Sequence, residues 1–285
     1  MILSKVKSMA GSSERKKIIS LITDFGLKDP FVGIMKGVML NINPDLVFVD
    51  ISHEIQPYNI LEAALTLKLA YRYFPKETIH LVVVDPGVGG ERLPLAASTA
   101  DYFFVGPDNG VLSLALEDAG EEKKVIELSE RGYFNEVISS TFQGRDIFAP
   151  AAAWLSGDVA LLEMGPLVSD FHKISLPKVK ICHGGVLRGE IIYSDHFGNL
   201  ITNIGKSDLE KLGKELGQTV DLSRGKFQIG PYEISGVKKR YDQGSSQDLS
   251  VLFNSFDLLE IFLYQASAQR FTQFGPEEKV IVSYE

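Results

Sequence analysis

The stretch "IISLITDFGLKDPFVGIMKGVMLNINPDLVFVD", residues 18–50, contains a complete strand–helix–strand unit. Residues 18–23 form an apolar run that predicts a buried strand. Residues 31–42 predict a helix that stops at Asn43-Pro44, because proline disfavours a helical residue before it and cannot continue the helix. Residues 46–49 predict a second strand. This order is typical of an α/β domain with a mostly parallel sheet.

The same alternation of strands and helices continues along the chain. A helix is expected from Asn59, because apolar side chains recur there at helical spacing. Further strands are expected at residues 78–84 and 102–106. Two later helical patterns complete the domain: "GVLSLALEDAG" (110–120) and "DIFAPAAAWLSG" (146–157).

Each of the four predicted strands is followed by a carboxylate or an amide. These residues are Asp24, Asp50, Asp85 and the pair Asp108 and Asn109. In a parallel sheet the carboxyl ends of the strands share one edge, which is where open α/β folds bind ligands. Asp and Asn also begin turns without any further role. The repetition in four successive strands favours a ligand site at this edge.

The pattern changes near residue 175. Short apolar runs separated by Gly, Asp, Asn and Ser follow, with one helix beginning near Ser207, and they predict a mainly antiparallel β domain. We therefore expect a polar lead-in at 1–16, an α/β domain at 17–175 and a β domain at 176–285.

Composition excludes several classes of function. The 285 residues carry a formal net charge of −8, and this acidic balance argues against a nucleic-acid surface. No stretch approaches the roughly 20 apolar residues of a membrane span, so no membrane partner is expected. The single cysteine, Cys182, cannot form an intramolecular disulfide. A reducing, cytoplasmic location is the natural expectation.

The glycine-rich segment "VVVDPGVGGER", residues 82–92, raises the question of phosphate binding. A dinucleotide motif beginning at Gly87 would need its third glycine at the position of Arg92, and no GxxxxGK[ST] sequence is present. The five histidines show no i, i+4 pair, and no GxSxG motif occurs. Nucleotide phosphates, a metal centre and a serine nucleophile are all disfavoured.

Three turns instead place an aromatic ring beside polar groups. They are "TDFGLKDP" (23–30), "SSTFQGRD" (139–146) and "YSDHFGNLITNI" (193–204). Such pairs can stack a flat ligand ring and hydrogen-bond its edge, although simple loop packing gives the same pattern.

The chain resembles a known family, the S-adenosyl-L-methionine (SAM) hydrolases that form adenosine, which are relatives of the fluorinase and chlorinase enzymes. The resemblance covers nearly the whole chain after residue 17 and rests on segments in family order: "TDFG", "MKG", "DISHEI", "VVDPGVG", "GPDNGVL", "TFQGRDIFAP" and "DHFGNLITNI". It implies a Rossmann-like N-terminal domain, a C-terminal β-barrel and a homotrimer whose site lies between subunits. It also implies SAM as a small-molecule substrate, attack of water at its 5′ carbon, and no cofactor.

The resemblance assigns substrate-binding roles to residues of both domains. Asp24 would hold the ribose hydroxyls, and Tyr58 would lie beside the ribose or the sulfonium. Phe197 and Asn199 would contact adenine, and Asp195 would lie near the methionine amino group. The full implied set is Asp24, Phe25, Tyr58, Phe142, Gly144, Asp195, Phe197, Asn199, Ser255 and Glu260. Two positions depart from the family: Asp257 replaces a glycine and Tyr264 an asparagine.

The catalytic residues implied by the resemblance are Asp85, Arg92 and Gln143. The hydrolases carry an aspartate and an arginine seven residues apart in this loop, and both are present here. The third family residue is a histidine, which is Gln143 in this chain. Glutamine orients water but takes no proton at neutral pH. Asp85 is therefore the expected base, with Arg92 fixing its carboxylate.

Two alternatives remain open at this point. A halogenase would hold a halide against the Gln143 amide, and Gly144 also occurs in the chlorinase, but halogenating relatives lack the Asp85 and Arg92 loop. A non-catalytic SAM or adenosine binder would have lost the activity together with the histidine.

Overall fold

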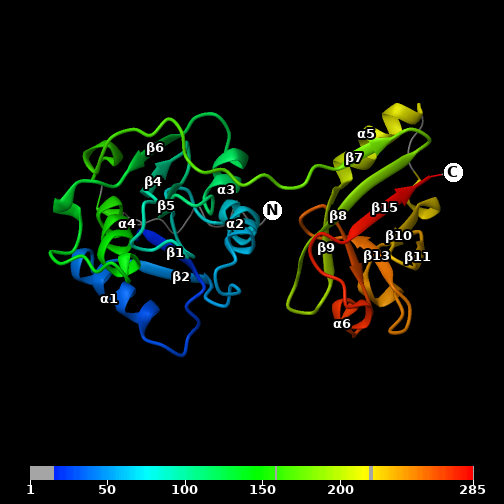
Figure 1. Ribbon diagram of the computed structural model, residues 1–285, viewed down its shortest axis with the longest axis horizontal. Coiled ribbons are helices and arrows are strands. Elements are labelled where there is room, and N and C mark those ends of the chain that lie inside the picture. The colour runs from blue at the N-terminus through cyan, green and yellow to red at the C-terminus, as the bar shows by residue number, and fades with distance from the viewer. Residues whose placement is uncertain (1–15, 158, 218–220, 285) are drawn as a thin grey trace, which may run out of the picture. The chain divides into compact units, whose positions relative to one another are not determined.

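The computed structural model describes residues 16–157, 159–217 and 221–284. The expected lead-in at 1–16 therefore lies outside the described residues except for Lys16. The chain divides into two compact units, Met1–Ile174 and Ser175–Glu285 (Figure 1). Each unit is described by itself below.

The first unit is built on a six-stranded sheet in the order β2-β1-β3-β5-β4-β6. The four strands from β2 to β5 in this order are parallel, whereas β4 runs antiparallel to both of its neighbours, β5 and the edge strand β6. The predicted mostly parallel α/β fold is therefore confirmed. The strands are β1 (Ile18–Thr23), β2 (Val47–Ser52), β3 (Ile79–Val83), β4 (Pro94–Ser98), β5 (Phe103–Pro107) and β6 (Lys124–Glu127).

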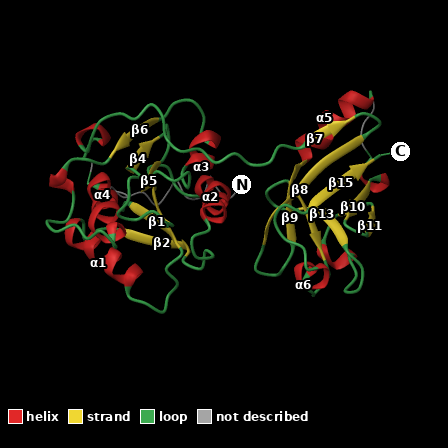
Figure 2. Cartoon of the chain, viewed as in Figure 1, coloured by secondary structure: helices red, strands yellow, loops and turns green. Residues whose placement is uncertain are grey.

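Helices cover both faces of this sheet (Figures 1 and 2). One core joins the sheet to α1 and α4 through buried residues such as Met35 and Ala152. A second core joins it to α2 and α3 through residues such as Leu67 and Ala115. The helices are α1 (Phe31–Ile42), α2 (Ile60–Ala70), α3 (Ser113–Asp118) and α4 (Ala149–Ser156). Short 3₁₀ turns occupy Tyr71–Tyr73, Arg131–Tyr133 and Leu161–Glu163.

Local sequence explains where two of these helices begin and end. Helix α1 stops at Ile42 and the chain turns extended at Asn43, as the following Pro44 predicts. Helix α2 begins after Asn59, whose side-chain oxygen accepts a hydrogen bond from Glu62 N at 3.1 Å. This N-cap satisfies one of the free amide groups of the first turn.

The structure corrects one element of the predicted carboxyl edge. Asp24 directly follows β1, and Asp85 and Asp108 follow β3 and β5. Asp50, however, lies inside β2 rather than after it. A register shift between Leu21 and Ile22 in the pairing of β1 with β2 accompanies the longer strand.

The second unit is a mostly antiparallel, barrel-like sheet, as expected. Eight strands follow the order β11-β10-β15-β8-β9-β14-β13-β12, and β7 pairs with β8. Only the short β12–β13 pairing among these described strands is parallel. The bounds are β7 (Lys180–Cys182), β8 (Val186–Ser194), β9 (Leu200–Gly205), β10 (Lys226–Ile229), β11 (Tyr232–Ser235), β12 (Val237–Lys238), β13 (Ser250–Phe253), β14 (Leu258–Phe262) and β15 (Lys279–Ser283).

Two helices complete the second unit, α5 (Lys206–Leu216) and α6 (Ala268–Thr272), with 3₁₀ turns at Leu222–Arg224 and Tyr241–Gln243. Helix α5 begins one residue before the predicted Ser207. The Asp208 carboxylate accepts a hydrogen bond from Gly205 N at 3.0 Å, so Asp208 satisfies the amide at the helix start. No helix among the described residues is long and apolar enough to cross a membrane.

Candidate active site

The structure brings Asp85, Arg92 and Gln143 together. Arg92 Nε lies 3.0 and 3.1 Å from the two carboxylate oxygens of Asp85, and Arg92 Nη2 lies 2.5 Å from Asp85 Oδ2. The same Nη2 donates to Gln143 Oε1 at 2.5 Å. The side chains of Asp85 and Arg92 are only 5% and 10% exposed. A buried ion pair of this kind needs such bidentate geometry to offset its desolvation.

Two loops create this contact. The glycine-rich turn after β3 packs directly on the loop that carries Gln143: a Cβ at Gly89 would lie 2.2 Å from the Ser140 carbonyl oxygen. Gly89 also has a φ of 75°, which favours glycine. Gly89 of "VVVDPGVGGER" thus serves the close packing of these two loops.

Gln143 has a fixed orientation in this arrangement. Its carbonyl oxygen accepts from Arg92, so its amide N–H groups are the ones left to donate to another group. Both Asp85 oxygens face Arg92. Each carboxylate oxygen has a second lone pair, which leaves Asp85 able to accept a proton from a water molecule.

Three phenylalanine rings, one of them from Phe142 next to Gln143, form an aromatic cluster. Phe25, Phe31 and Phe142 meet edge to face, with ring centroids 5.3 to 6.1 Å apart. The Arg145 guanidinium lies 5.3 Å from the Phe142 centroid. Gly144 begins a five-residue π-helix, Gly144–Phe148, which precedes α4. Motif and periodicity predicted neither Phe31 as a member of this cluster nor the π-helix, which often marks functional sites.

Asp24 and Tyr58 are joined through the backbone. Asp24 Oδ2 accepts a hydrogen bond from Tyr58 N at 2.9 Å. Tyr58 has a φ of 69° and a side chain that is largely exposed at 72%. A tyrosine in this left-handed region carries a steric cost of about 1–2 kcal/mol. Strained residues of this kind cluster in loops that contact ligands.

A network of polar side chains, of which Thr23 and His53 are buried and Asp50 is exposed, lies beside the turn that carries Asp24. His53 Nδ1 lies 2.8 Å from Thr23 Oγ1, and its Nε2 lies 3.1 Å from Asp50 Oδ1. Asp50 in turn accepts from Lys36 Nζ at 2.6 Å. Burial opposes ionisation of Asp50, but Lys36 and His53 together outweigh it and hold the pKa of Asp50 below its usual value.

The backbone of His53 also holds this turn, because Gly26 N donates a hydrogen bond to the His53 carbonyl oxygen at 2.8 Å. His53 is a buried residue that fixes the turn at Asp24. The sequence signal for it was weak: a lone histidine three residues after Asp50.

Three of the five candidate residues of the second unit line a surface hollow of about 800 Å³. Asp195, Phe197 and Asn199 line it, and the Phe197 ring is 75% exposed. Five side chains that the sequence did not suggest also line the hollow: Tyr241, Gln265, Ser267, Gln269 and Arg270. Gln265 in this lining has a backbone φ of 56°, in the left-handed region. The hollow therefore has an exposed aromatic face and several polar edges, which suits a flat heterocycle.

Asp195 organises the turn beside this hollow. Its Oδ1 accepts from Phe197 N and Asn199 N at 2.9 and 2.8 Å, and its Oδ2 accepts from Asn199 Nδ2 at 2.9 Å. Gly198 is required within the turn, because its φ is 81° and a Cβ would lie 2.0 Å from Ser267 Oγ. The turn holds Phe197 outward while Asn199 is buried.

Glu260 lies inside β14 and is 3% exposed. Tyr241, which lines the hollow, donates to Glu260 Oε1 at 2.8 Å. Burial, with Asp195 adding repulsion, raises the pKa of Glu260 despite that hydrogen bond. Burial also raises the pKa of nearby Tyr193 to about 12. Tyr241, and not the buried Glu260, lines the hollow.

Ser255 does not line the hollow. It is exposed in the turn before β14, whereas the loop that forms the hollow follows the other end of that strand. Asp257 in the same turn has a φ of 60°, which explains why a glycine suits this position. Its carboxylate forms an ion pair with Lys206.

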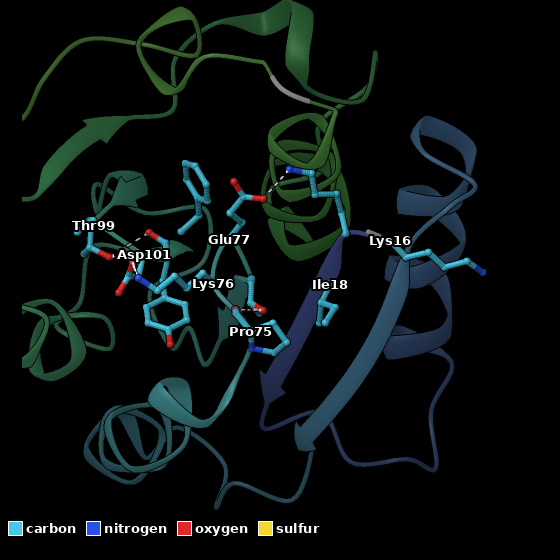
Figure 3. Close-up of a pocket in the computed structure, with 12 residues that line it drawn as sticks. Lys16, Ile18, Pro75, Lys76, Glu77, Thr99 and Asp101 are labelled. Atoms are coloured by element: carbon cyan, nitrogen blue, oxygen red, sulfur yellow. Dashed lines mark hydrogen bonds and ion pairs between the residues drawn. The ribbon is translucent and has the colours of Figure 1, made fainter. Parts of the chain in front are cut away.

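Two further observations concern other places where a ligand or a metal ion could bind. A hollow of about 620 Å³ at the amino ends of β1 and β3 is lined by the ion pairs Lys17–Glu77 and Lys76–Asp101 (Figure 3). No candidate residue lines it. Among the described residues, no group of three or more His, Cys, Asp or Glu side chains could hold a metal ion.

Family models match both units of the chain. The SAM hydroxide adenosyltransferase N-terminal domain matches residues 19–165, and the corresponding C-terminal domain matches residues 189–281. The chain belongs to the SAM hydroxide adenosyltransferase family. The relationship predicted from the sequence motifs is therefore confirmed.

Curated members of this family include hydrolases and halogenases. The (R)-S-adenosyl-L-methionine hydrolase of Salinispora tropica is 38% identical over 200 residues, covering 70% of this chain and 76% of the relative. The enzyme of the same name from Methanocaldococcus jannaschii is 39% identical over 197 residues, covering 67% and 68%. A fluorinase from Actinoplanes sp. is 32% identical over 264 residues, covering 84% and 88%.

A solved family fold is also similar over nearly the whole chain. The crystal structure of an uncharacterized conserved protein from Thermotoga maritima matches with a TM-score of 0.84 and 33% identity, covering 93% of this chain and 99% of that one. The two-domain architecture is thus shared by a family member of known structure.

Proposed function

We propose that this protein is a SAM hydrolase that forms adenosine and L-methionine. The observation that carries the proposal is the buried Asp85–Arg92–Gln143 constellation at the carboxyl edge of the sheet. Curated hydrolases at 38% and 39% identity support the same reaction. Their names specify the (R) epimer of the substrate, and we extend that preference to this chain.

In the proposed reaction, water attacks the 5′ carbon of SAM. The carbon–sulfur bond breaks, its electron pair goes to the sulfonium, and methionine leaves as a neutral thioether. No general acid is required for this leaving group. The attacking water must lose a proton, which Asp85 accepts while the Gln143 amide aligns the water. Arg92 holds both residues in place through its short hydrogen bonds.

The substrate-binding roles follow the chemistry of each side chain. Asp24 is assigned to the ribose hydroxyls, because a carboxylate accepts two hydrogen bonds from a diol. Tyr58 and the rings of Phe25 and Phe142 suit the sulfonium and the reacting carbon, with Gly144 beside Phe142. In the second unit, Phe197 is assigned to stack on adenine. Asp195 and Asn199 complete the set at this hollow, Glu260 supports it through the hydrogen bond from Tyr241, and Ser255 is assigned by the family resemblance alone.

The proposal includes the setting of the enzyme. We assign it to the cytoplasm as a homotrimer in which two neighbouring subunits complete each site. No cofactor is required, since the sulfonium of SAM already supplies the leaving group.

The decisive experiment incubates the protein with each SAM epimer in ¹⁸O-labelled water and follows the nucleosides by mass spectrometry. Labelled adenosine from the (R) epimer is expected. Asp85→Asn should lower kcat by about 10²- to 10⁴-fold, the usual contribution of a general base. Asp24→Asn is the matched control, because it removes the same charge but should mainly raise KM. Full activity of Asp85→Asn would overturn the mechanism.

Halogenation is the second candidate, since a fluorinase covers 84% of the chain at 32% identity. The same incubation with added fluoride or chloride separates the two reactions. A halogenated nucleoside in place of labelled adenosine would assign this chain to the halogenases. Intact SAM retained by the protein would make it a binding protein that has lost the chemistry.

A further inference from the structure

The second unit carries a further hollow that none of the candidate substrate residues lines. It has a volume of about 430 Å³ and lies where β7, β8 and β15 run side by side (Figure 1). Four cationic side chains line it: Lys178, Lys180, Arg188 and Lys279. This concentration of positive charge is unusual for a chain with a net charge of −8.

Strand register gathers these cations on one face. Lys180 of β7 lies directly opposite Arg188 of β8, and Arg188 lies opposite Ile281 of β15. One step along, Glu190 lies opposite Lys279. Arg188 is exposed while its neighbour in sequence, Leu187, is buried. The alternation of the strand therefore turns these charges outward as a group.

Most of this charge is not neutralised by the protein. Lys279 forms an ion pair with Glu190. In the part of the chain that the structure describes, the side chains of Lys178, Lys180 and Arg188 form no hydrogen bond or ion pair. Like charges directly opposite each other destabilise a sheet. A bound anion would remove the repulsion between Lys180 and Arg188.

The cationic face is compact rather than extended. The row that contains Lys180, Arg188 and Ile281 continues to Gln228 of β10 and ends at Glu233 of β11. The lining carries four cations and one carboxylate. An extended nucleic-acid strand needs a longer basic track than this. A pocket of this volume lies within the range of roughly 300–1,000 Å³ that small ligands occupy.

We propose that this hollow is a binding site for a polyphosphate group, independent of the SAM site. Arg188 supplies a planar fork that matches phosphate oxygens, and the lysines supply point charges around it. Ile281 is the apolar side chain of the lining. Asn203 is held there because its Oδ1 accepts a hydrogen bond from Glu190 N and its Nδ2 donates one to the Pro177 carbonyl oxygen. Binding stabilises the folded chain, because only the folded sheet assembles the cations.

The test is isothermal titration of the full chain, at low ionic strength, with orthophosphate, pyrophosphate, tripolyphosphate and ATP. Binding should strengthen from orthophosphate to tripolyphosphate and should raise the melting temperature. Equal affinity for ATP and tripolyphosphate assigns the site to the phosphate chain alone, whereas tighter binding of ATP that the Lys180→Gln, Arg188→Gln double substitution abolishes assigns it to a nucleotide. Both results support the proposal.

The matched variants are two double substitutions that remove equal charge from the same unit. Lys180→Gln with Arg188→Gln should weaken tripolyphosphate binding at least about tenfold, or about 1.4 kcal/mol. Lys214→Gln with Lys239→Gln, at exposed positions elsewhere, should leave it unchanged. SAM turnover should be unaffected in both. Equal binding by the two doubles, absence of binding, or tighter binding of single-stranded DNA or anionic vesicles would overturn the assignment.

Discussion

At the scale of the residue, Gln143 stands where the resemblance to the hydrolases implies a histidine. A glutamine aligns water but takes no proton at neutral pH. Gln143→His should therefore raise kcat about tenfold or more, within the usual range for an added general base. It should also make kcat fall as pH drops below about 6.5, where the imidazole is protonated. Initial rates between pH 5 and 8 measure both effects.

Gln143→Leu is the control for this substitution. It removes the hydrogen bond from Arg92 and supplies neither a donor nor a base, so it should be slower than the unmodified protein. If the histidine and leucine variants are equally slow, the role of Gln143 is to hold Arg92 and not to align water.

At the scale of the element, the network of Thr23, His53, Asp50 and Lys36 fixes the turn between β1 and α1. His53→Leu removes the contacts at both ring nitrogens and should loosen the turn that carries Asp24. Ribose binding is the same in substrate and transition state, so KM should rise about tenfold while kcat changes little. Steady-state kinetics with SAM measures the split.

His53→Asn tests the same idea from the other side. Asparagine keeps a group near the Nδ1 position that bonds to Thr23 and should recover part of the lost affinity. A drop in kcat with an unchanged KM in the leucine variant would mean that His53 acts on the chemistry instead.

A second buried histidine, His80 in β3, makes the stability of the folded protein depend on pH. His80 is fully buried among Tyr71, Phe74 and Phe104, with Nδ1 2.7 Å from Ser20 Oγ. Burial lowers the pKa of His80 to about 3. The unfolded chain, with an ordinary histidine pKa, takes up this proton near pH 6.5. The contribution of His80 to the free energy of unfolding is therefore complete above pH 6.5. It decreases by about 1.4 kcal/mol per pH unit as the pH falls toward 3.

Urea unfolding from pH 7.5 to 4.5 tests this prediction by comparison with His80→Gln. Glutamine keeps a partner for Ser20 but does not titrate, so the variant should lose less stability over this range. Parallel curves for the two proteins would show that His80 does not carry the acid sensitivity.

At the scale of the whole molecule, the sequence predicted what depends on local pattern. The apolar runs of residues 18–50 predicted β1, α1 and β2, and the family resemblance implied that Asp85 and Arg92 act together, which they do within a single loop. Apart from the grouping of Gln143 with Asp85 and Arg92, which the resemblance implied, contacts between distant segments were not predicted. His53 meets Thr23 because of the register of β1 with β2, and Tyr241 meets Glu260 because a turn folds back on β14.

The two units have separate hydrophobic cores, and each unit holds its own set of candidate residues. We therefore expect residues 17–174 and residues 175–285, expressed separately, each to unfold in one cooperative transition, since both exceed the size at which a domain supports its own core. Circular dichroism during heating measures this. Neither piece should hydrolyse SAM at the rate of the full chain, because the first lacks the hollow assigned to adenine and the second lacks Asp85. Full activity in residues 17–174 alone would show that the second unit takes no part in binding the substrate.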